Sequence, residues 1–177
     1  MDKNGYLSKS DFLLHKAEEL VINASVQEVN LIACGGIAVH MLSDSIGAQS
    51  PRPWNHKDID FVVPLSQLSK AIAFFKAIGY VKVFVPYKKQ RLVSNHIRFA
   101  NVFDEKKVLV DIYGLSVVNV IFIEWKGVKI MLLCPRVELE NWLDRKRRLG
   151  SKPSINLSID LLTEVVNKKL FGEHELR

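Results

Sequence analysis

The sequence predicts an α/β protein of the α+β kind, in which helices flank a mixed β-sheet. Three observations predict this class: helical and strand-like segments alternate in the first half, several strand-like segments then follow in succession, and two helical segments close the chain. The chain of 177 residues, 48% hydrophobic and 25% charged, is long enough to bury a sizeable core. We therefore expect a single domain over residues 1–177, with a core at about 31–114 and a C-terminal helical part at about 135–177.

The first half alternates between apolar residues at helical spacing and short continuous apolar runs. Phe12, Leu13, Ala17 and Leu20 recur at helical spacing, whereas the run NLIACGG is continuous and ends in two glycines. Two prolines exclude regular structure from the stretch AQSPRPWNHK. The expected elements are a helix over 10–30, a strand over 30–36, a helix over 37–47, a loop over 48–57, a strand over 58–64 and a helix over 65–80.

The second half is typical of hairpin-connected strands followed by helices. Lys126 and Gly127 between two apolar runs indicate a hairpin turn, and DEKK at 104–107 suits a tight connection. The stretch GSKPS separates the last two helical segments. The expected strands cover 81–87, 95–103, 107–114 and 119–133, the last as a hairpin, and the expected helices cover about 136–149 and 156–170.

The charge of the chain and the character of its N-terminus indicate which partner and which compartment to expect. The net charge of +6 and the pI near 9.3 favour a polyanionic or phosphate-bearing partner. Two basic stretches, YKKQR at 87–91 and DRKRRLGSK at 144–152, either are solvated or contact a triphosphate or an RNA backbone. The N-terminus has no apolar segment of a secretion signal, and no run approaches a membrane span, so we expect a cytoplasmic protein with no membrane partner.

Cys34 and Cys134 are the two cysteines of the chain. Both lie inside apolar runs, and their spacing matches no zinc motif. We therefore expect buried, reduced thiols rather than a disulfide or a metal site.

The stretch WNHKDIDFVVP places two aspartates at the mouth of an apolar run. In a strand, Asp58 and Asp60 point to the same side, with Cα atoms roughly 6.5 Å apart at about 3.3 Å per residue. A magnesium ion would remove the repulsion between them, because it takes hard oxygen ligands from one or two carboxylates together with water and phosphate. Alternatively, Asp58 caps a turn and Asp60 pairs with Lys57 or Arg52.

Two further features bear on this aspartate pair. Gly35 and Gly36 end a strand and open directly into a helix, where exposed N–H groups and the helix dipole favour phosphate, although such a pair can also be a simple tight turn. Asp111 interrupts a strand that is apolar on both faces. Either it lies near a sheet edge and accepts a hydrogen bond from a loop, or it joins Asp58 and Asp60 as a third carboxylate.

In combination, CGGIAVHML, the arginine-containing loop SPRPWNHK, DIDFVVP and VLVDIYG resemble nucleotidyltransferases of the DNA polymerase beta-like superfamily. The resemblance covers roughly 31–114 and is nearest to the small bacterial branch with antibiotic nucleotidyltransferases and abortive-infection toxins of toxin–antitoxin systems. Two departures are the 21 residues between Gly36 and Asp58, more than in the minimal motif, and Ile37, where the antibiotic enzymes often have tryptophan.

The resemblance implies roles for individual residues. Phosphate binding falls on Gly35 and Gly36, metal binding on Asp58 and Asp60, and metal binding or general-base duty on Asp111; the metal would be two magnesium ions. Lys146 and Asp160 in the C-terminal helices are candidates for contact with the nucleotide. Arg52 either neutralises the β- or γ-phosphate or is an ordinary loop arginine.

The implied activity is transfer of a nucleoside monophosphate from a nucleoside triphosphate (NTP) to a hydroxyl of a small molecule, RNA or protein, with release of pyrophosphate. The alternative is a catalytically inactive nucleotide-binding or partner-binding module of the same fold, as in a toxin–antitoxin component with a partner protein. A phosphohydrolase is disfavoured because no histidine cluster accompanies the aspartates. His56 reads as an exposed loop histidine, Trp54 either stacks on a base or is buried, and Tyr113 and the segment 96–99 are candidates to line the acceptor side.

Overall fold

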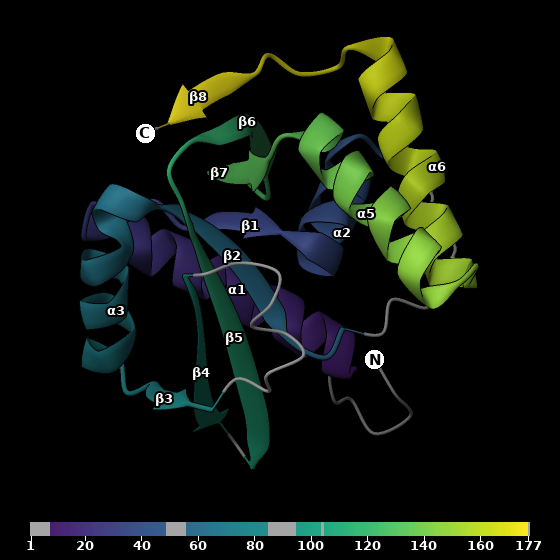
Figure 1. The fold of residues 1–177 in the computed structure, drawn as a ribbon. Coiled ribbons are helices and arrows are strands. Elements are labelled where there is room, and N and C mark those ends of the chain that lie inside the picture. Colours follow the sequence, from purple (N-terminus) through teal and green to yellow (C-terminus); the bar gives the residue numbers. More distant parts are fainter. Residues whose placement is uncertain (1–7, 49–55, 85–94, 104, 177) are drawn as a thin grey trace.

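A computed structural model describes residues 8–48, 56–84, 95–103 and 105–176. Its centre is one mixed sheet in the strand order β3-β4-β5-β2-β1-β7-β6-β8, with helices packed around it (Figure 1). Neighbouring strands pair antiparallel except for β2 with β5 and β1 with β7, which are parallel. The expected mixed sheet flanked by helices is confirmed.

The strands agree with the expected segments, with two differences. Of the expected segment 81–87, the structure describes 81–84, where Val81–Val83 forms a strand and Phe84 lies beyond it. The C-terminal strand β8 was not expected and pairs with β6. The described strands are β1 (Ile32–Cys34), β2 (Ile59–Pro64), β3 (Val81–Val83), β4 (His96–Phe103), β5 (Lys106–Leu115), β6 (Val118–Trp125), β7 (Val128–Leu133) and β8 (His174–Leu176).

The hairpin between β6 and β7 turns at the expected position. Lys126 and Gly127 have φ values of 51° and 76°. Two successive positive φ values are the conformation that a two-residue hairpin turn requires, and glycine adopts it at no steric cost. The Lys–Gly step therefore fixes the register of this strand pair.

The helices also lie close to their expected positions. The helix α2 begins at Gly35, two residues earlier than expected, and α6 begins at Pro153, whose fixed φ suits a first helical turn. The described helices are α1 (Lys9–Val26), α2 (Gly35–Ser45), the 3₁₀ turn η1 (Leu65–Gln67), α3 (Leu68–Ala77), α5 (Pro135–Leu149) and α6 (Pro153–Lys168). Among the described residues, no helix combines the length and the apolar character needed to cross a membrane.

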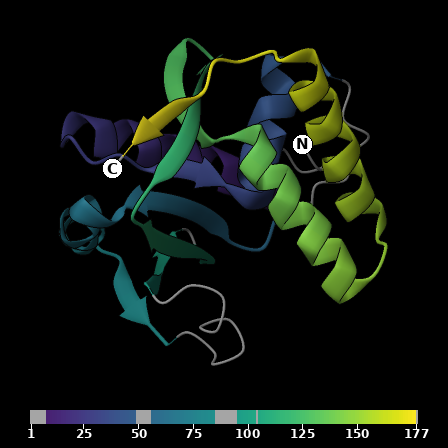
Figure 2. The same cartoon turned by 45° about the horizontal axis from the view of Figure 1, so that its top comes forward.

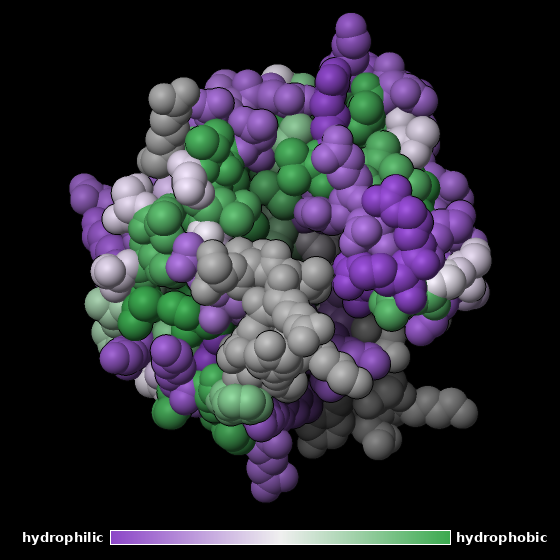
Figure 3. All heavy atoms as spheres, viewed as in Figure 1, coloured by the Kyte–Doolittle hydropathy of each residue, from purple (hydrophilic) through white to green (hydrophobic). Residues whose placement is uncertain are grey.

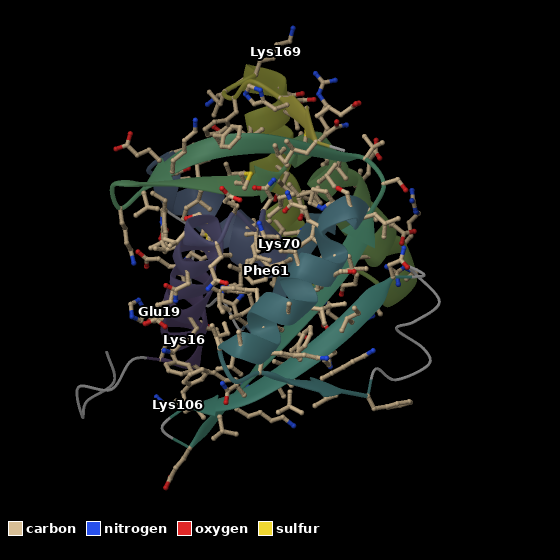
Figure 4. The ribbon with its side chains drawn as sticks, turned by 90° about the vertical axis from the view of Figure 1, so that its left-hand side faces the viewer. Lys16, Glu19, Phe61, Lys70, Lys106 and Lys169 are labelled. Carbon is tan, nitrogen blue, oxygen red and sulfur yellow. The ribbon has the colours of Figure 1, made fainter. Side chains whose placement is uncertain are left out.

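The two faces of the sheet carry two separate groups of buried apolar side chains. The larger group joins one face of the sheet to α1, α2 and α3 and includes Phe61, which is fully buried and lies between α1 and α3 in Figure 4. The smaller group, on the other face, includes Ile32, Cys34 and Val62. Because side chains alternate along β2, Asp60 shares this second face with Val62.

The helices α5 and α6 pack side by side, and α6 also packs against α2 (Figure 2). Hydrophilic residues gather over α5 on the face shown in Figure 3. The exposed Arg147 and Arg148 of this helix pair with Asp144. Both cysteines are free and buried, as expected.

Candidate active site

A single row across four adjacent strands contains the residues of the candidate site. Cys34 of β1 is paired with Asp60 of β2, Asp60 with Asp111 of β5, and Asp111 with Arg98 of β4. Residues paired across neighbouring strands point to the same face, so these four side chains share one side of the sheet. Asp111 thus lies on a strand beside Asp60, in the interior of the sheet rather than near its edge.

Arg98 joins two of the three aspartates. Its Nε donates to Asp111 Oδ1 at 2.6 Å, and its Nη2 donates to Asp111 Oδ2 and, at 2.9 Å, to Asp58 Oδ2. The Arg98 side chain is 11% exposed, and that of Asp111 is fully buried. Two parallel bonds between a guanidinium and a carboxylate form one of the strongest pairings available to side chains. Asp58 is therefore paired with Arg98 rather than acting only as the cap of a turn.

Two aromatic rings support the carboxylates. His96 Nε2 lies 2.9 Å from Asp111 Oδ1, and Tyr113 Oη donates to Asp60 Oδ1 at 3.3 Å. The two rings stack with their centroids 4.6 Å apart. Burial, followed by the charge of Asp60, raises the pKa of the Tyr113 phenol, so it remains a donor. These contacts place both rings on the carboxylates; that they line an acceptor stays a prediction.

The Arg98–Asp111 pair is charged at neutral pH. Burial acts to raise the pKa of Asp111, but hydrogen bonds from Arg98 and His96 and the charge of Arg98 outweigh burial and hold the pKa below its ordinary value. The hydrogen bond to Asp111 is the main cause that raises the pKa of Arg98. A buried carboxylate is thus kept ionised by an arginine that the sequence motifs did not single out.

The glycine turn lies against Asp60. Gly35 has φ +66°, and a Cβ placed on it would stand 2.9 Å from Asp60 Oδ2. A side chain at this position would therefore meet both backbone strain and a carboxylate. The glycine turn, where α2 begins, therefore lies directly against Asp60, which the spacing of the two motifs in the sequence does not reveal.

The side chain of Glu138, on α5, is hydrogen-bonded to a backbone N–H of this turn. Its Oε1 accepts a hydrogen bond from the Gly35 N–H at 2.6 Å, although the two residues are 103 positions apart. Burial raises the Glu138 pKa to about 7, against the opposing effects of the Gly35 hydrogen bond, the charge of Arg145 and a hydrogen bond from Trp142. The Gly35 N–H, expected to meet phosphate, is thus already bonded to a carboxylate.

The expectation for His56 was wrong. The residue is buried, its Nε2 lies 3.0 Å from Nδ1 of His40, and its backbone N–H donates to Ser10 Oγ. Burial, with a further contribution from His40, lowers the His56 pKa to about 4. Gly36 leaves room for this ring, since a Cβ there would stand 3.3 Å from His56 Nδ1. His56 therefore belongs to the packing behind the glycine turn.

The remaining candidate residues are less closely tied to the site. Arg52, Trp54 and the basic stretch 87–91 lie outside the described residues. Lys146 is half-buried on α5 and Asp160 is exposed on α6. In the part of the chain that the structure describes, neither forms an ion pair with the three aspartates. Their contact with a nucleotide stays a prediction.

The aspartate pair has the chemistry to hold a divalent ion. Asp58, just before β2, and Asp60, within β2, offer hard carboxylate oxygens, which fits magnesium. Asp111 already accepts two bonds from Arg98 and lies against His96. Within residues 8–48, 56–84, 95–103 and 105–176, no group of three or more His, Cys, Asp or Glu side chains is arranged to hold a metal. The metal role of all three aspartates remains a prediction.

A cavity between α5 and α6 is separate from this site. It has a volume of about 140 Å³ and is lined by residues such as Pro135, Arg136 and Phe171. Nucleotide-sized ligands need roughly 300 Å³ or more. This cavity therefore does not compete with the aspartate row as a nucleotide site.

Comparison with known proteins gives structural matches only. No family model matches the sequence, and no curated protein matches it. The crystal structure of ANT(2″)-Ia in complex with adenylyl-2″-tobramycin matches with a TM-score of 0.58 and 10% identity, over 89% of this chain and 91% of the other. The lincosamide antibiotic adenylyltransferase LnuA, lincomycin-bound, matches with a TM-score of 0.59 and 14% identity, over 85% and 96%.

An antigenic nucleotidyltransferase-like protein from Paracoccidioides brasiliensis also matches, with a TM-score of 0.59 and 16% identity, over 88% of this chain and 77% of the other. Each match spans the sheet and the helices together rather than one motif, since it covers most of both chains. At these identities the likeness concerns the fold. The chain shares the polymerase beta-like nucleotidyltransferase fold with these matches.

Proposed function

We propose that this protein is a magnesium-dependent nucleotidyltransferase that transfers a nucleoside monophosphate from an NTP to a hydroxyl of a small molecule, RNA or protein. The proposal treats residues 1–177 as a single nucleotidyltransferase domain. The observation that carries it is the row Cys34–Asp60–Asp111, which brings the end of the β1 strand, the aspartate pair and the third aspartate to one face of the sheet. Motifs up to 77 residues apart in the sequence meet there.

Different residues of the chain would have different roles in such a reaction. Asp58 and Asp60 would hold the divalent ion, which supplies charge neutralisation for the triphosphate when bound. The helix dipole of α2 favours phosphate near the glycine turn, where Gly36 follows Gly35. Asp111 is the candidate general base; its lowered pKa keeps it ionised at neutral pH but also makes it a weaker base.

A binding module of the same fold, such as a component of a toxin–antitoxin pair, is the second candidate. The observation that favours it is the double bond between Arg98 and Asp111, which leaves the proposed base fully engaged. Such a module would bind nucleotide and transfer nothing. The two functions differ in whether a labelled nucleotide becomes attached to an acceptor.

The first test is a thermal-shift panel with the four ribonucleoside triphosphates, each with and without magnesium. The wild type should show a magnesium-dependent rise in Tm for at least one nucleotide, because a ligand that binds only the folded state stabilises it. The variant Asp58→Asn/Asp60→Asn should lose this rise. Glu164→Gln, which removes a negative charge from an exposed ion pair on α6, should keep it.

The outcomes separate the proposals. A shift in the wild type that the double variant retains would remove the aspartate pair from the nucleotide site. If the shift behaves as expected, incubation with α-³²P-labelled nucleotide and candidate acceptors follows. A labelled acceptor supports transfer, whereas binding with no labelled acceptor and no released pyrophosphate favours the binding module.

A further inference from the structure

A fixed cation lies within the proposed metal site. The Arg98 guanidinium bonds to both oxygens of Asp111 through Nε and Nη2, and Nη2 also reaches Asp58 Oδ2 at 2.9 Å. The arginine is delivered by β4, directly opposite Asp111 in the strand register. The sheet therefore sets the position of Arg98, and the protein encloses most of its side chain.

This arrangement competes with a metal ion at Asp111. A carboxylate has about four lone-pair positions, and Asp111 already uses two for Arg98 and has His96 Nε2 at 2.9 Å from Oδ1. A divalent ion on the same carboxylate would stand within a few ångströms of the guanidinium, where like charges repel strongly because the site is buried. Asp111 is thus occupied by a cation that the chain itself supplies.

The exposure of the carboxylates leads to the same conclusion. The side chain of Asp111 is fully buried. The side chain of Asp58, by contrast, is one-quarter exposed, and Asp60 faces the glycine turn. The open side of the site is at the aspartate pair.

We propose that Arg98 takes the place of one of the two metal ions, so that the site binds a single divalent ion at Asp58 and Asp60 and uses Arg98 to orient Asp111. The inference rests on the proposed function, since it concerns the metal requirement of the same site. Arg98 is in this sense a positioning residue: it acts on the reaction through Asp111 and Asp58.

Equilibrium dialysis with manganese as the metal probe tests the proposal. The nucleotide is the α,β-methylene analogue of the NTP that gives the largest thermal shift, so that no transfer can occur. The excess of manganese and of nucleotide on the protein side gives the number of ions bound for each nucleotide. The wild type should bind about one ion for each nucleotide.

Two substitutions of Arg98 and one matched control complete the experiment. Arg98→Met removes the cation and frees Asp111, so the ratio should rise to about two. Arg98→Lys keeps the charge and should stay at about one, which ties a rise in Arg98→Met to the lost cation. If the methionine variant fails to fold, the wild-type ratio still decides between one ion and two. Arg136→Met removes an exposed arginine paired with Glu173 and should leave the ratio at one.

Each outcome decides the matter. A wild-type ratio of about two would overturn this inference and leave the proposed function intact. A folded Arg98→Met variant that remains at one ion would also overturn it, because another group would then exclude the second ion. No nucleotide-dependent metal binding in the wild type would overturn the proposed function itself, and the inference with it.

Discussion

Asp111 and Glu138 are two buried carboxylates of the same candidate site whose pKa values move in opposite directions. Burial acts to raise both pKa values. Asp111 lies against a guanidinium, which overcomes burial, whereas Glu138 is held by the uncharged N–H groups of Gly35 and Trp142 and feels Arg145 only through its charge. Hydrogen bonds from neutral donors therefore hold Glu138 in place without keeping it ionised.

The difference assigns the two carboxylates different tasks in the folded chain. The charge of Asp111 is balanced by Arg98 in a buried ion pair, so removing the charge of either residue should destabilise the folded state. The charge of Glu138 destabilises the folded state because the side chain is buried, while its hydrogen bond to the Gly35 N–H connects α5 to the glycine turn. Removing the charge of each residue should therefore have effects of opposite sign on stability, which gives a direct test of the comparison.

The largest expected effect is that of Asp111→Asn. This change removes the ionised partner that bonds to Arg98 twice and leaves the arginine only its single bond to Asp58; breaking a buried pair from one side costs about 3 kcal/mol or more. We expect the free energy of unfolding at neutral pH to fall by that amount in urea denaturation, with an unchanged m-value.

Asp144→Asn is the matched control for this prediction. Asp144 also pairs with arginine, at 2.7 Å from Arg148 Nε, but the pair is on the surface of α5. Exposed pairs contribute little to stability, so the urea midpoint should not change measurably. Equal effects of the two substitutions would show that the Arg98–Asp111 pair is no more stabilising than a surface pair.

Glu138→Gln should act in the opposite direction. The folded-state pKa of Glu138 is raised from its ordinary 4.5 to about 7. Its contribution to stability is therefore full below the unfolded-state pKa and is lost as the pH rises through about 7. At about 1.4 kcal/mol for each pKa unit, the loss is up to about 3 kcal/mol.

Glutamine keeps an acceptor for the Gly35 N–H and carries no charge. Between pH 5 and about 8, the variant should lack this part of the decline and become more stable than the wild type at the alkaline end. Urea midpoints measured across that range give the result, with the exposed Glu164→Gln as the control for charge. A variant less stable than the wild type at pH 8 would mean that the ionised carboxylate stabilises the turn.

The sequence predicted those parts of the molecule that depend on local patterns. Apolar spacing predicted the helices and the sheet strands other than β8, and the Lys126–Gly127 step predicted a hairpin turn that the structure confirms. The order of the glycine pair and the aspartates predicted the fold that the structural matches support. Such features require only neighbouring residues and their periodicity.

The partners of the carboxylates could not be predicted in this way. Arg98 alternates with apolar residues in β4 like any polar residue of a half-exposed strand, and only the register with β5 reveals its contact with Asp111. Glu138 reaches Gly35 across 103 positions, and no local pattern encodes that contact. His56 was misassigned because its burial depends on His40 and Ser10, which come from two different helices.

The smallest expected effect is a difference between two glycine substitutions, and it tests whether the turn itself supports the aspartate pair. Gly35 and Gly47 have nearly the same φ, +66° and +64°, so alanine meets similar backbone strain, about 1 kcal/mol, at both. A Cβ at Gly47 would meet open space, whereas one at Gly35 would stand 2.9 Å from Asp60 Oδ2. Gly35→Ala should therefore lower the free energy of unfolding in urea by about 1 kcal/mol more than Gly47→Ala, because the Asp60 carboxylate must move.

Gly35→Ala should also abolish the magnesium-dependent thermal shift, which Gly47→Ala should retain. If both variants keep the shift, the position of Asp60 against the turn does not matter for nucleotide binding, and the site must be held together by the β2–β5 register alone.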